Sequence, residues 1–166
     1  RDNKNIARKL LAVTQVHIEK VFKKTQDTLA LLPFHPSDQP AVKALILAGL
    51  VEHWGFLDPT KNPDLDDIAA SYAGATFLVA RLGNAIVGTG ALLPHQNGIA
   101  EVVRMSVAQS HRRDGIGRRI LLALLEQARA QGFRQVTLET TATWHEVVMF
   151  YLKCGFHITH HQDGDV

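Results

Sequence analysis

The clearest hydrophobic pattern in this chain lies between residues 100 and 131, where an apolar run, a basic turn and a periodic segment follow one another. The first run is rich in β-branched residues and is as long as a strand, so it predicts a buried strand over 101–107. From Ile116 onward, apolar residues recur at every fourth position as far as Ala128, which predicts an amphipathic helix with one buried face. Gly132 is a typical signal for the end of such a helix.

Similar patterns predict the other elements. Strands are expected at 28–34, 75–82, 85–93, 101–107, 135–141 and 156–161, and helices at 4–24, from 39 to about 49–55, at 64–72, at 116–131 and at 144–153. The two residues Gly83 and Asn84 between alternating strands predict a β-hairpin. The strand–helix–strand order after residue 100 predicts a parallel pair with a right-handed crossover. Together, these elements predict an α/β (α+β) fold with a mixed, mostly antiparallel central sheet and helices on both faces.

Composition and charge narrow the class of protein. The 166 residues are 46% hydrophobic and 20% charged, as in an ordinary globular domain, and no apolar run approaches the ~20 residues of a membrane span. The formal net charge is only +2, and the arginines gather at 104–119, which favours a small anionic ligand over a nucleic-acid surface. The single cysteine, Cys154, cannot form an internal disulfide and favours a reducing, cytoplasmic setting.

The first residues indicate how the chain is divided. Residues 1–27 are expected to form an N-terminal amphipathic extension, and residues 28–166 the main domain. Because the chain begins at Arg1 without a methionine, we expect it to be a fragment of a longer protein.

The basic turn before the helix at 116–131 is the strongest candidate for a ligand site. Four cations lie at the positive end of that helix: Arg112, Arg113, Arg118 and Arg119. Such crowding is unfavourable unless an anion binds there, so a phosphate-bearing ligand is predicted, with a solvated basic turn as the alternative. The spacing matches neither the GxxxxGK[ST] phosphate loop nor the GxGxxG dinucleotide motif.

The pattern Arg112-x-x-Gly115-x-Gly117 resembles the acetyl-CoA signature of the Gcn5-related N-acetyltransferase (GNAT) superfamily, and FYLKCGF at 150–156 resembles its LYxxxGF segment. The resemblance covers about residues 28–161. It implies a fold in which the two central parallel strands splay apart to admit acetyl-CoA. It also implies an N-acetyltransferase that moves the acetyl group to a primary amine by direct attack in a ternary complex.

The resemblance assigns cofactor contacts to ten residues. Met105, Ser106 and Val107 would follow the pantetheine arm. The phosphate turn would consist of Arg112, Arg113, Asp114, Gly115, Ile116, Gly117 and Arg118. Among the departures from the family pattern, Trp144 stands where an asparagine is usual, and Asp114 places a negative charge inside the turn.

Two residues match catalytic positions of the family. Tyr151 would be the general acid that protonates the leaving thiolate, or else a packing residue between helix and sheet. Glu101 would be the general base, acting directly or through water, or else a solvent-facing charge at the start of a strand. The loop with His53, Trp54 and Phe56 is expected to form one wall of the acceptor pocket. Glu52 and Asp58 are then available to attract an ammonium group.

Other chemistries are less well supported. His157, His160 and His161 lack the spacing of a metal site, so no metal is expected. The alternative to an enzyme is a non-catalytic domain of a larger protein that senses acetyl-CoA or CoA, and a third possibility is a structural protein with solvated arginines. The partners expected are a small-molecule or peptide amine and, at a free sheet edge, a second copy of the chain, but neither nucleic acid nor membrane.

Overall fold

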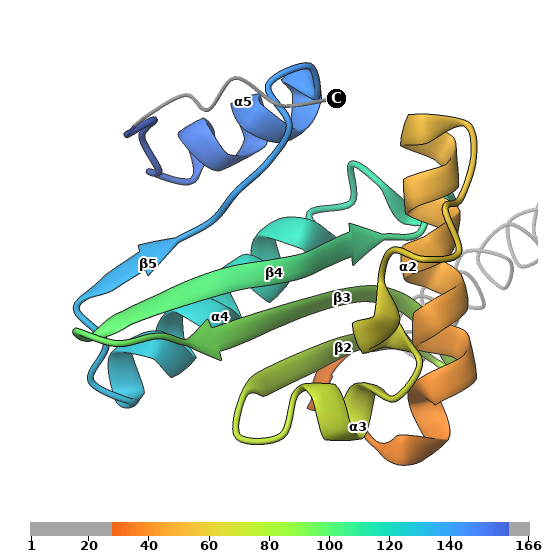
Figure 1. Cartoon of the computed structure of the whole chain (residues 1–166), viewed down its shortest axis with the longest axis horizontal. Helices are drawn as coiled ribbons and strands as arrows, with labels where there is room; N and C mark the ends of the chain where they lie inside the picture. The colour runs from red at the N-terminus through yellow and green to blue at the C-terminus, as the bar shows by residue number, and fades with distance from the viewer. Residues whose placement is uncertain (1–27, 160–166) are drawn as a thin grey trace, which may run out of the picture.

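The computed structural model describes residues 28–159, which are built around one five-stranded sheet of order β1-β2-β3-β4-β5 (Figure 1). The strands are β1 (Leu29–Pro33), β2 (Thr76–Leu82), β3 (Ala85–Pro94), β4 (Ile99–Val107) and β5 (Gln135–Thr137). The first four are antiparallel neighbours, whereas β5 runs parallel to β4. The predicted mixed, mostly antiparallel sheet is therefore confirmed, and the helix predicted at 4–24 lies outside the described residues.

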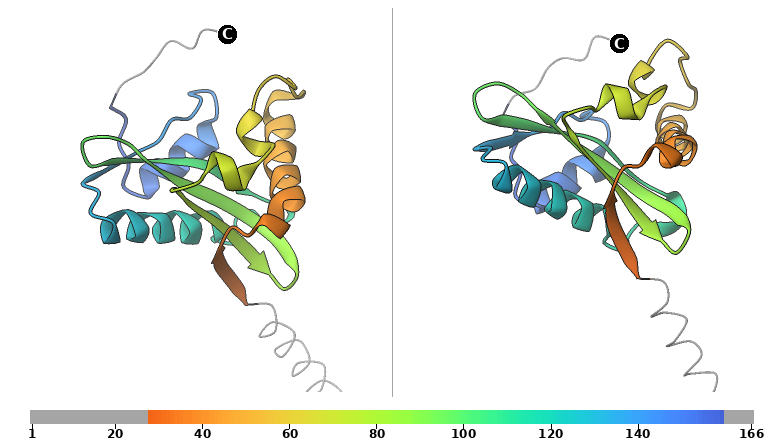
Figure 2. Two further views of the ribbon diagram at one scale, coloured as in Figure 1. Left: turned by 60° about the horizontal axis from the view of Figure 1, so that its bottom comes forward. Right: turned by 90° about the horizontal axis from the view of Figure 1, so that it is seen from below.

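Helices lie on both faces of this sheet (Figure 2). They are α2 (Gln39–Trp54), α3 (Ile68–Ser71), α4 (Ile116–Ala130) and α5 (His145–Lys153), with 3₁₀ turns at Pro36–Asp38, Pro63–Leu65 and Gln109–His111. One face is covered by α2 and α3, and the opposite face by α4. Among the described helices, none combines the length and the apolar character needed to cross a membrane.

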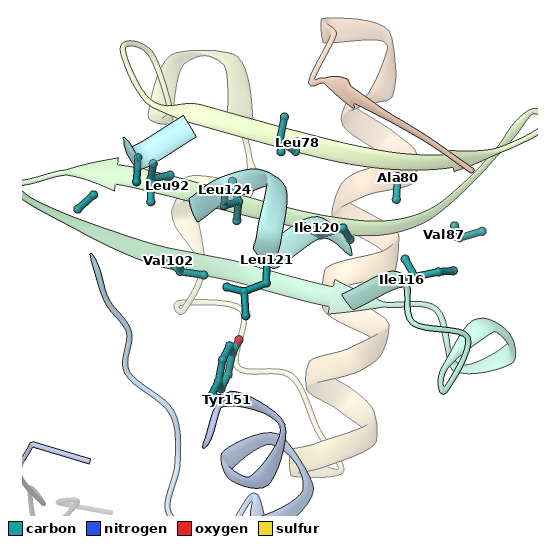
Figure 3. Close-up of a cluster of buried hydrophobic side chains, with 12 residues drawn as sticks. Leu78, Ala80, Val87, Leu92, Val102, Ile116, Ile120, Leu121, Leu124 and Tyr151 are labelled. Atoms are coloured by element: carbon teal, nitrogen blue, oxygen red, sulfur yellow. The ribbon is translucent and has the colours of Figure 1, made fainter. Parts of the chain in front are cut away.

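Two glycines allow α4 to lie directly on β3. A Cβ atom added at Gly88 would lie 2.7 Å from Cδ1 of Ile120, and one added at Gly90 would lie 2.6 Å from Cγ2 of the same residue. Ile120, Leu121 and Leu124 are fully buried as a result (Figure 3). The predicted apolar stripe of α4 is confirmed, and it holds the N-terminus of the helix next to the end of β4.

A bulge divides β4 at Arg104. The pairing with β3 shifts between Thr89 and Ala91, and Arg104 has a φ of 53°, which is uncommon for a residue with a side chain. Thr89 stabilises this conformation, because its hydroxyl donates a hydrogen bond to the carbonyl oxygen of Arg104 at 2.8 Å. The bulge directs the Arg104 side chain to the α3 side of the sheet, while Met105 lies on the α4 side.

Three predicted elements differ from the structure. The strand expected at 135–141 ends at Thr137, and the helix expected at 64–72 is a 3₁₀ turn followed by the short α3. The strand expected at 156–161 is absent over its described part, 156–159. Phe156 instead packs its ring against Tyr151, with the ring centroids 5.8 Å apart, and β5 is too short to offer a partner strand.

Candidate active site

A gap between β4 and β5 lies at the centre of the candidate site. The two strands pair at three positions, with Glu101 and Thr137 as the last pair before they diverge (Figure 1). Beyond Glu101, β4 continues through Met105, Ser106 and Val107 with no described strand on that side. An extended ligand could therefore lie along this edge as a further strand does, using the backbone groups of β4.

The basic turn connects this edge to α4. Arg113 and Gly115 both have positive φ angles, of 67° and 77°, and they turn the chain into the helix. The helix has no side-chain cap, and its first hydrogen bond runs from the N–H of Arg119 to the carbonyl of Gly115 at 3.1 Å. The N–H groups of residues 116–118 therefore precede that bond and face outward, as in anion sites at helix N-termini.

The cations around this helix end differ in their partners. Arg113, Arg118 and Arg119 are exposed and form no ion pair within residues 28–159. Asp114 is exposed too, and it does not cap the helix. The excess of positive charge at the helix end is consistent with the predicted anion.

Gly117 lies where the end of β4 approaches α5. A Cβ atom added there would lie 3.5 Å from Cγ2 of Val107 and 3.7 Å from the ring of Phe150. These are ordinary contact distances, so the protein itself does not require glycine at this position. A side chain larger than alanine at this position would come into contact with Val107 and Phe150.

Tyr151 lies on the α4 side of this gap. Its side chain is 8% exposed, and its hydroxyl points from α5 toward β4 and α4, near Val102 and Leu121 (Figure 3). The hydroxyl makes no hydrogen bond within the described residues. Burial, and to a smaller extent the nearby Cys154, raises the pKa of Tyr151 to about 12. The phenol therefore keeps its proton at ordinary pH and has no internal acceptor for it.

Glu101 lies on the other face of the sheet, at the point where the strands diverge. Its neighbours along the strand, Ala100 and Val102, face α4, so its own side chain faces the α3 side. One carboxylate oxygen lies 3.2 Å from Nε2 of His95, and the side chain is 22% exposed. The predicted acid and base therefore flank β4 from opposite faces.

A cavity of about 510 Å³ opens beside Glu101 on the α3 side. It is lined by Asp64, Ser71, Tyr72, Leu93, Glu101, Val102, Val103, Arg104 and Glu139. Both Nε and Nη2 of Arg104 donate to the carboxylate of Asp64, at 2.9 and 2.6 Å, and the hydroxyl of Tyr72 donates to the same carboxylate at 2.5 Å. Burial and this hydrogen bond raise the pKa of Tyr72 to about 12.

The comparison with known proteins agrees with this geometry. The model of the Acetyltransferase (GNAT) family matches residues 43–156, which is more than half of the chain. The chain belongs to the GNAT family. A GNAT-family acetyltransferase from Staphylococcus aureus Mu50 has the same fold, with a TM-score of 0.73 and 23% identity over 78% of this chain and 85% of that one.

Sequence relatives carry acetyltransferase names. An uncharacterized N-acetyltransferase of Escherichia coli, YjgM, is 30% identical over 72% of this chain and 76% of its own length. An IAA acetyltransferase of Azospirillum brasilense is 36% identical over 71% and 78%, respectively. The rat N-acetyltransferase 8F1 is 36% identical over 103 residues, and the match spans about half of that protein (47%). These relatives support an acetyltransferase function for this GNAT domain.

The signature arginine of the GNAT domain, Arg112, does not face the turn. Its two terminal nitrogens bind the carboxylate of Glu52 in α2 at 2.6 and 2.8 Å, and its Nε donates to the carbonyl of Val107 at 3.2 Å. The hydrogen bond from Arg112 lowers the pKa of Glu52. Arg112 therefore links the phosphate turn to the last turn of α2, and its contact with phosphate stays a prediction.

Trp144, which departs from the family pattern, makes a second contact with the end of α2. Its ring stacks on His53 with 4.0 Å between the centroids and 15° between the planes. Trp54 and Phe56 are 51% and 69% exposed. The wall expected from this loop does not line the described cavity, and Glu52, expected to attract an ammonium group, is already paired with Arg112.

The sequence did not reveal the cluster around Arg104. Arg104 belongs to the basic stretch 104–119, but its charge is compensated by Asp64, 40 residues away. Neither the positive φ angle of Arg104 nor its pairing with the distant Asp64 produces a local pattern in the sequence. The one available signal was the three acids at the start of the predicted helix at 64–72.

Proposed function

We propose that this domain is an N-acetyltransferase that moves the acetyl group of acetyl-CoA to a primary amine by direct attack in a ternary complex. The proposal rests on one arrangement: the free edge of β4 runs from Glu101 to an uncapped, basic helix N-terminus. A thioester donor with a long arm and a pyrophosphate suits this arrangement. The GNAT family match supports the same donor.

The donor would be held mainly by backbone groups. Met105, Ser106 and Val107 would bind the pantetheine arm along the edge of β4. The phosphates would lie against the segment from Arg112 to Arg118. That segment offers N–H groups at Ile116 and Gly117, and the side chains of Arg113 and Arg118 add charge that no described acid compensates. Acetyl-CoA supplies an activated acetyl group and a thiol leaving group, and no metal is needed in this chemistry.

The two titratable residues would move the protons. Glu101 accepts a proton from the amine, directly or through water, so that the nitrogen lone pair can attack the carbonyl carbon. The new C–N bond forms, the C–S bond breaks, and the nitrogen releases its second proton to solvent as the amide is formed. Tyr151 donates its hydroxyl proton to the departing sulfur, and both side chains then exchange protons with solvent. Glu101 and Tyr151 flank β4 from opposite faces. Glu101 can therefore accept the proton of the amine while Tyr151 protonates the leaving thiolate.

A thiol-release assay tests this function. The purified chain is mixed with acetyl-CoA and a panel of primary amines, and free CoA thiol is followed with time. We expect release that depends on both the enzyme and the amine, with an acetamide product by mass spectrometry. Tight binding of acetyl-CoA without release above the hydrolytic blank for any amine would contradict the proposal.

The single cysteine supports a reducing, cytoplasmic site of action.

A further inference from the structure

The cavity beside Glu101 has an unbalanced charge. Its described lining includes three carboxylates, from Asp64, Glu101 and Glu139, and one guanidinium, from Arg104. The lining therefore holds two more carboxylates than guanidinium groups. The cavity is an open depression, and its volume of about 510 Å³ is large enough to admit a small molecule.

The one cation in the described lining is already paired with an acid and makes four of its five possible hydrogen bonds. Arg104 makes two hydrogen bonds to the Asp64 carboxylate, and its two terminal nitrogens also donate to Oδ1 of Asn62 at 3.1 and 3.2 Å. Its side chain is 19% exposed, and its backbone is held in the bulge by Thr89. No positive charge is left in this lining to bind a carboxylate on an acceptor.

The two remaining carboxylates stand on either side of the gap. Glu101 is the last residue of β4 that pairs with β5. Glu139 lies two residues beyond the end of β5, is exposed, and has no hydrogen bond or ion pair with the described residues. In the proposed function Glu101, which also contacts Nε2 of His95 at 3.2 Å, serves the attacking amine, whereas Glu139 has no described partner at the same cavity.

From this arrangement we infer that the acceptor is a small amine with a second positive charge and no carboxylate, such as an aliphatic diamine. The inference rests on the proposed function and names its substrate class. Glu101 serves the nitrogen that attacks, and Glu139 pairs with the ammonium at the far end. The Arg104–Asp64 pair excludes a competing anionic group, because that group would face two acids and find no free cation.

Three acceptors of one length test the charge preference. They are 1,4-diaminobutane, butylamine and 4-aminobutanoate, which end in a positive, a neutral and a negative group. In the thiol-release assay at low salt, we expect kcat/KM for the diamine to exceed that for butylamine about fivefold, the range of a partly exposed ion pair, with 4-aminobutanoate slowest. The preference should shrink as salt is added. Equal rates, or a preference for 4-aminobutanoate, would overturn the inference.

Two Glu→Gln variants, each of which removes one negative charge, test whether the preference for the diamine arises at the cavity. Glu139→Gln should reduce the ratio of kcat/KM values for the diamine over butylamine to about one- to twofold. Glu126→Gln removes a similar exposed charge from α4, on the opposite face of the sheet, and should leave that ratio as in the parent. A ratio unaffected by Glu139→Gln contradicts the role of Glu139.

Calorimetry separates this inference from the proposed function. The same three compounds are titrated into the protein in the presence of CoA, without turnover. Tighter binding of the diamine, lost in Glu139→Gln, supports the charge selectivity even if no amine is acetylated. Thiol release from uncharged amines with no preference for the diamine supports the activity and rejects the substrate class.

Discussion

Tyr151 shows how much can depend on a single hydroxyl group. Its ring is packed on Phe156, yet its hydroxyl has no partner within the described residues. Tyr151→Phe keeps the ring and removes the proton donor, so acetyl-CoA affinity should stay close to that of the parent. We expect kcat to fall about 10²-fold, the low end for general acid catalysis, because CoA is a fairly good leaving group. Single-turnover kinetics and calorimetry measure the two effects. Full turnover in the variant would identify Tyr151 as a packing residue.

The pH profile tests the same hydroxyl. A general acid must be protonated, and burial raises the pKa of Tyr151 to about 12 from the ordinary 10.0. The rate in the parent should therefore rise as the amine loses its proton and then stay level past pH 10, because Tyr151 remains protonated. A fall in kcat/KM centred near pH 10, absent in Tyr151→Phe, would mean that the phenol ionises as if exposed.

Arg112 is predicted to contribute to acetyl-CoA binding, but less than a free arginine would. Its guanidinium is already paired with Glu52, so part of its charge is compensated before any phosphate arrives. Arg112→Ala should weaken binding by about 1.5 kcal/mol, the low end for a hydrogen bond to a charged group. Arg129→Ala, at the other end of α4, is the control and should bind as the parent does. Calorimetry at two salt concentrations measures both variants. Unchanged binding in Arg112→Ala would remove this residue from the site.

At the scale of elements, two glycines distinguish packing from function. Gly90→Ala would place a Cβ 2.6 Å from Ile120 and 2.7 Å from Sδ of Met105, so α4 must move away from β3. We expect a loss of about 1–3 kcal/mol in the free energy of unfolding, as for other overpacked cores. Urea titration followed by circular dichroism measures this loss. A variant as stable as the parent would show that α4 is not held against β3 in this way.

Gly117→Ala is predicted to behave in the opposite way. Its new Cβ makes only ordinary contacts, with 3.5 Å to Val107, and alanine is the better helix former by about 1 kcal/mol. The variant should therefore be at least as stable as the parent, yet bind acetyl-CoA more weakly if the phosphates approach the backbone of the turn at this glycine, as the resemblance implies. Gly117→Val should bind more weakly still. If both variants bind acetyl-CoA like the parent, the anion site is misplaced.

The elements also show what the sequence could and could not predict. The stripe of α4 and the hairpin at Gly83 were readable because each repeats one local pattern over many residues. The length of β5 could not be predicted, because its three paired residues end where β4 and β5 diverge. That point is set by the packing of the two strands and not by the strand propensity of residues 138–141. The positions of Tyr151 and Glu101 came from resemblance, and their catalytic roles stay predictions. Arg104 and Asp64 meet only in three dimensions.

At the scale of the whole molecule, the two tyrosines of the chain link stability to alkaline pH. Burial raises the pKa of both Tyr72 and Tyr151 to about 12, and the hydrogen bond to Asp64 adds to the effect at Tyr72. In the unfolded chain, both should titrate near the ordinary 10.0. Above that pH the folded state holds more protons than the unfolded state, so stability is lost as pH rises from about 10 toward 12 and is unaffected by these groups below 10.

Two measurements check this linkage. Tyrosinate absorbance should stay low in the folded protein up to about pH 11 and then rise together with unfolding, since both phenols are protected. Urea titrations at stepwise higher pH should show the parent losing about 1.4 kcal/mol per pH unit more than Tyr151→Phe in this range, because the variant lacks that titrating group. Tyrosinate that forms near pH 10 while circular dichroism still reports a folded domain would mean that water reaches the phenols. The Tyr151 hydroxyl would then ionise as an exposed phenol does and would be poorly suited to keep its proton for a leaving thiolate.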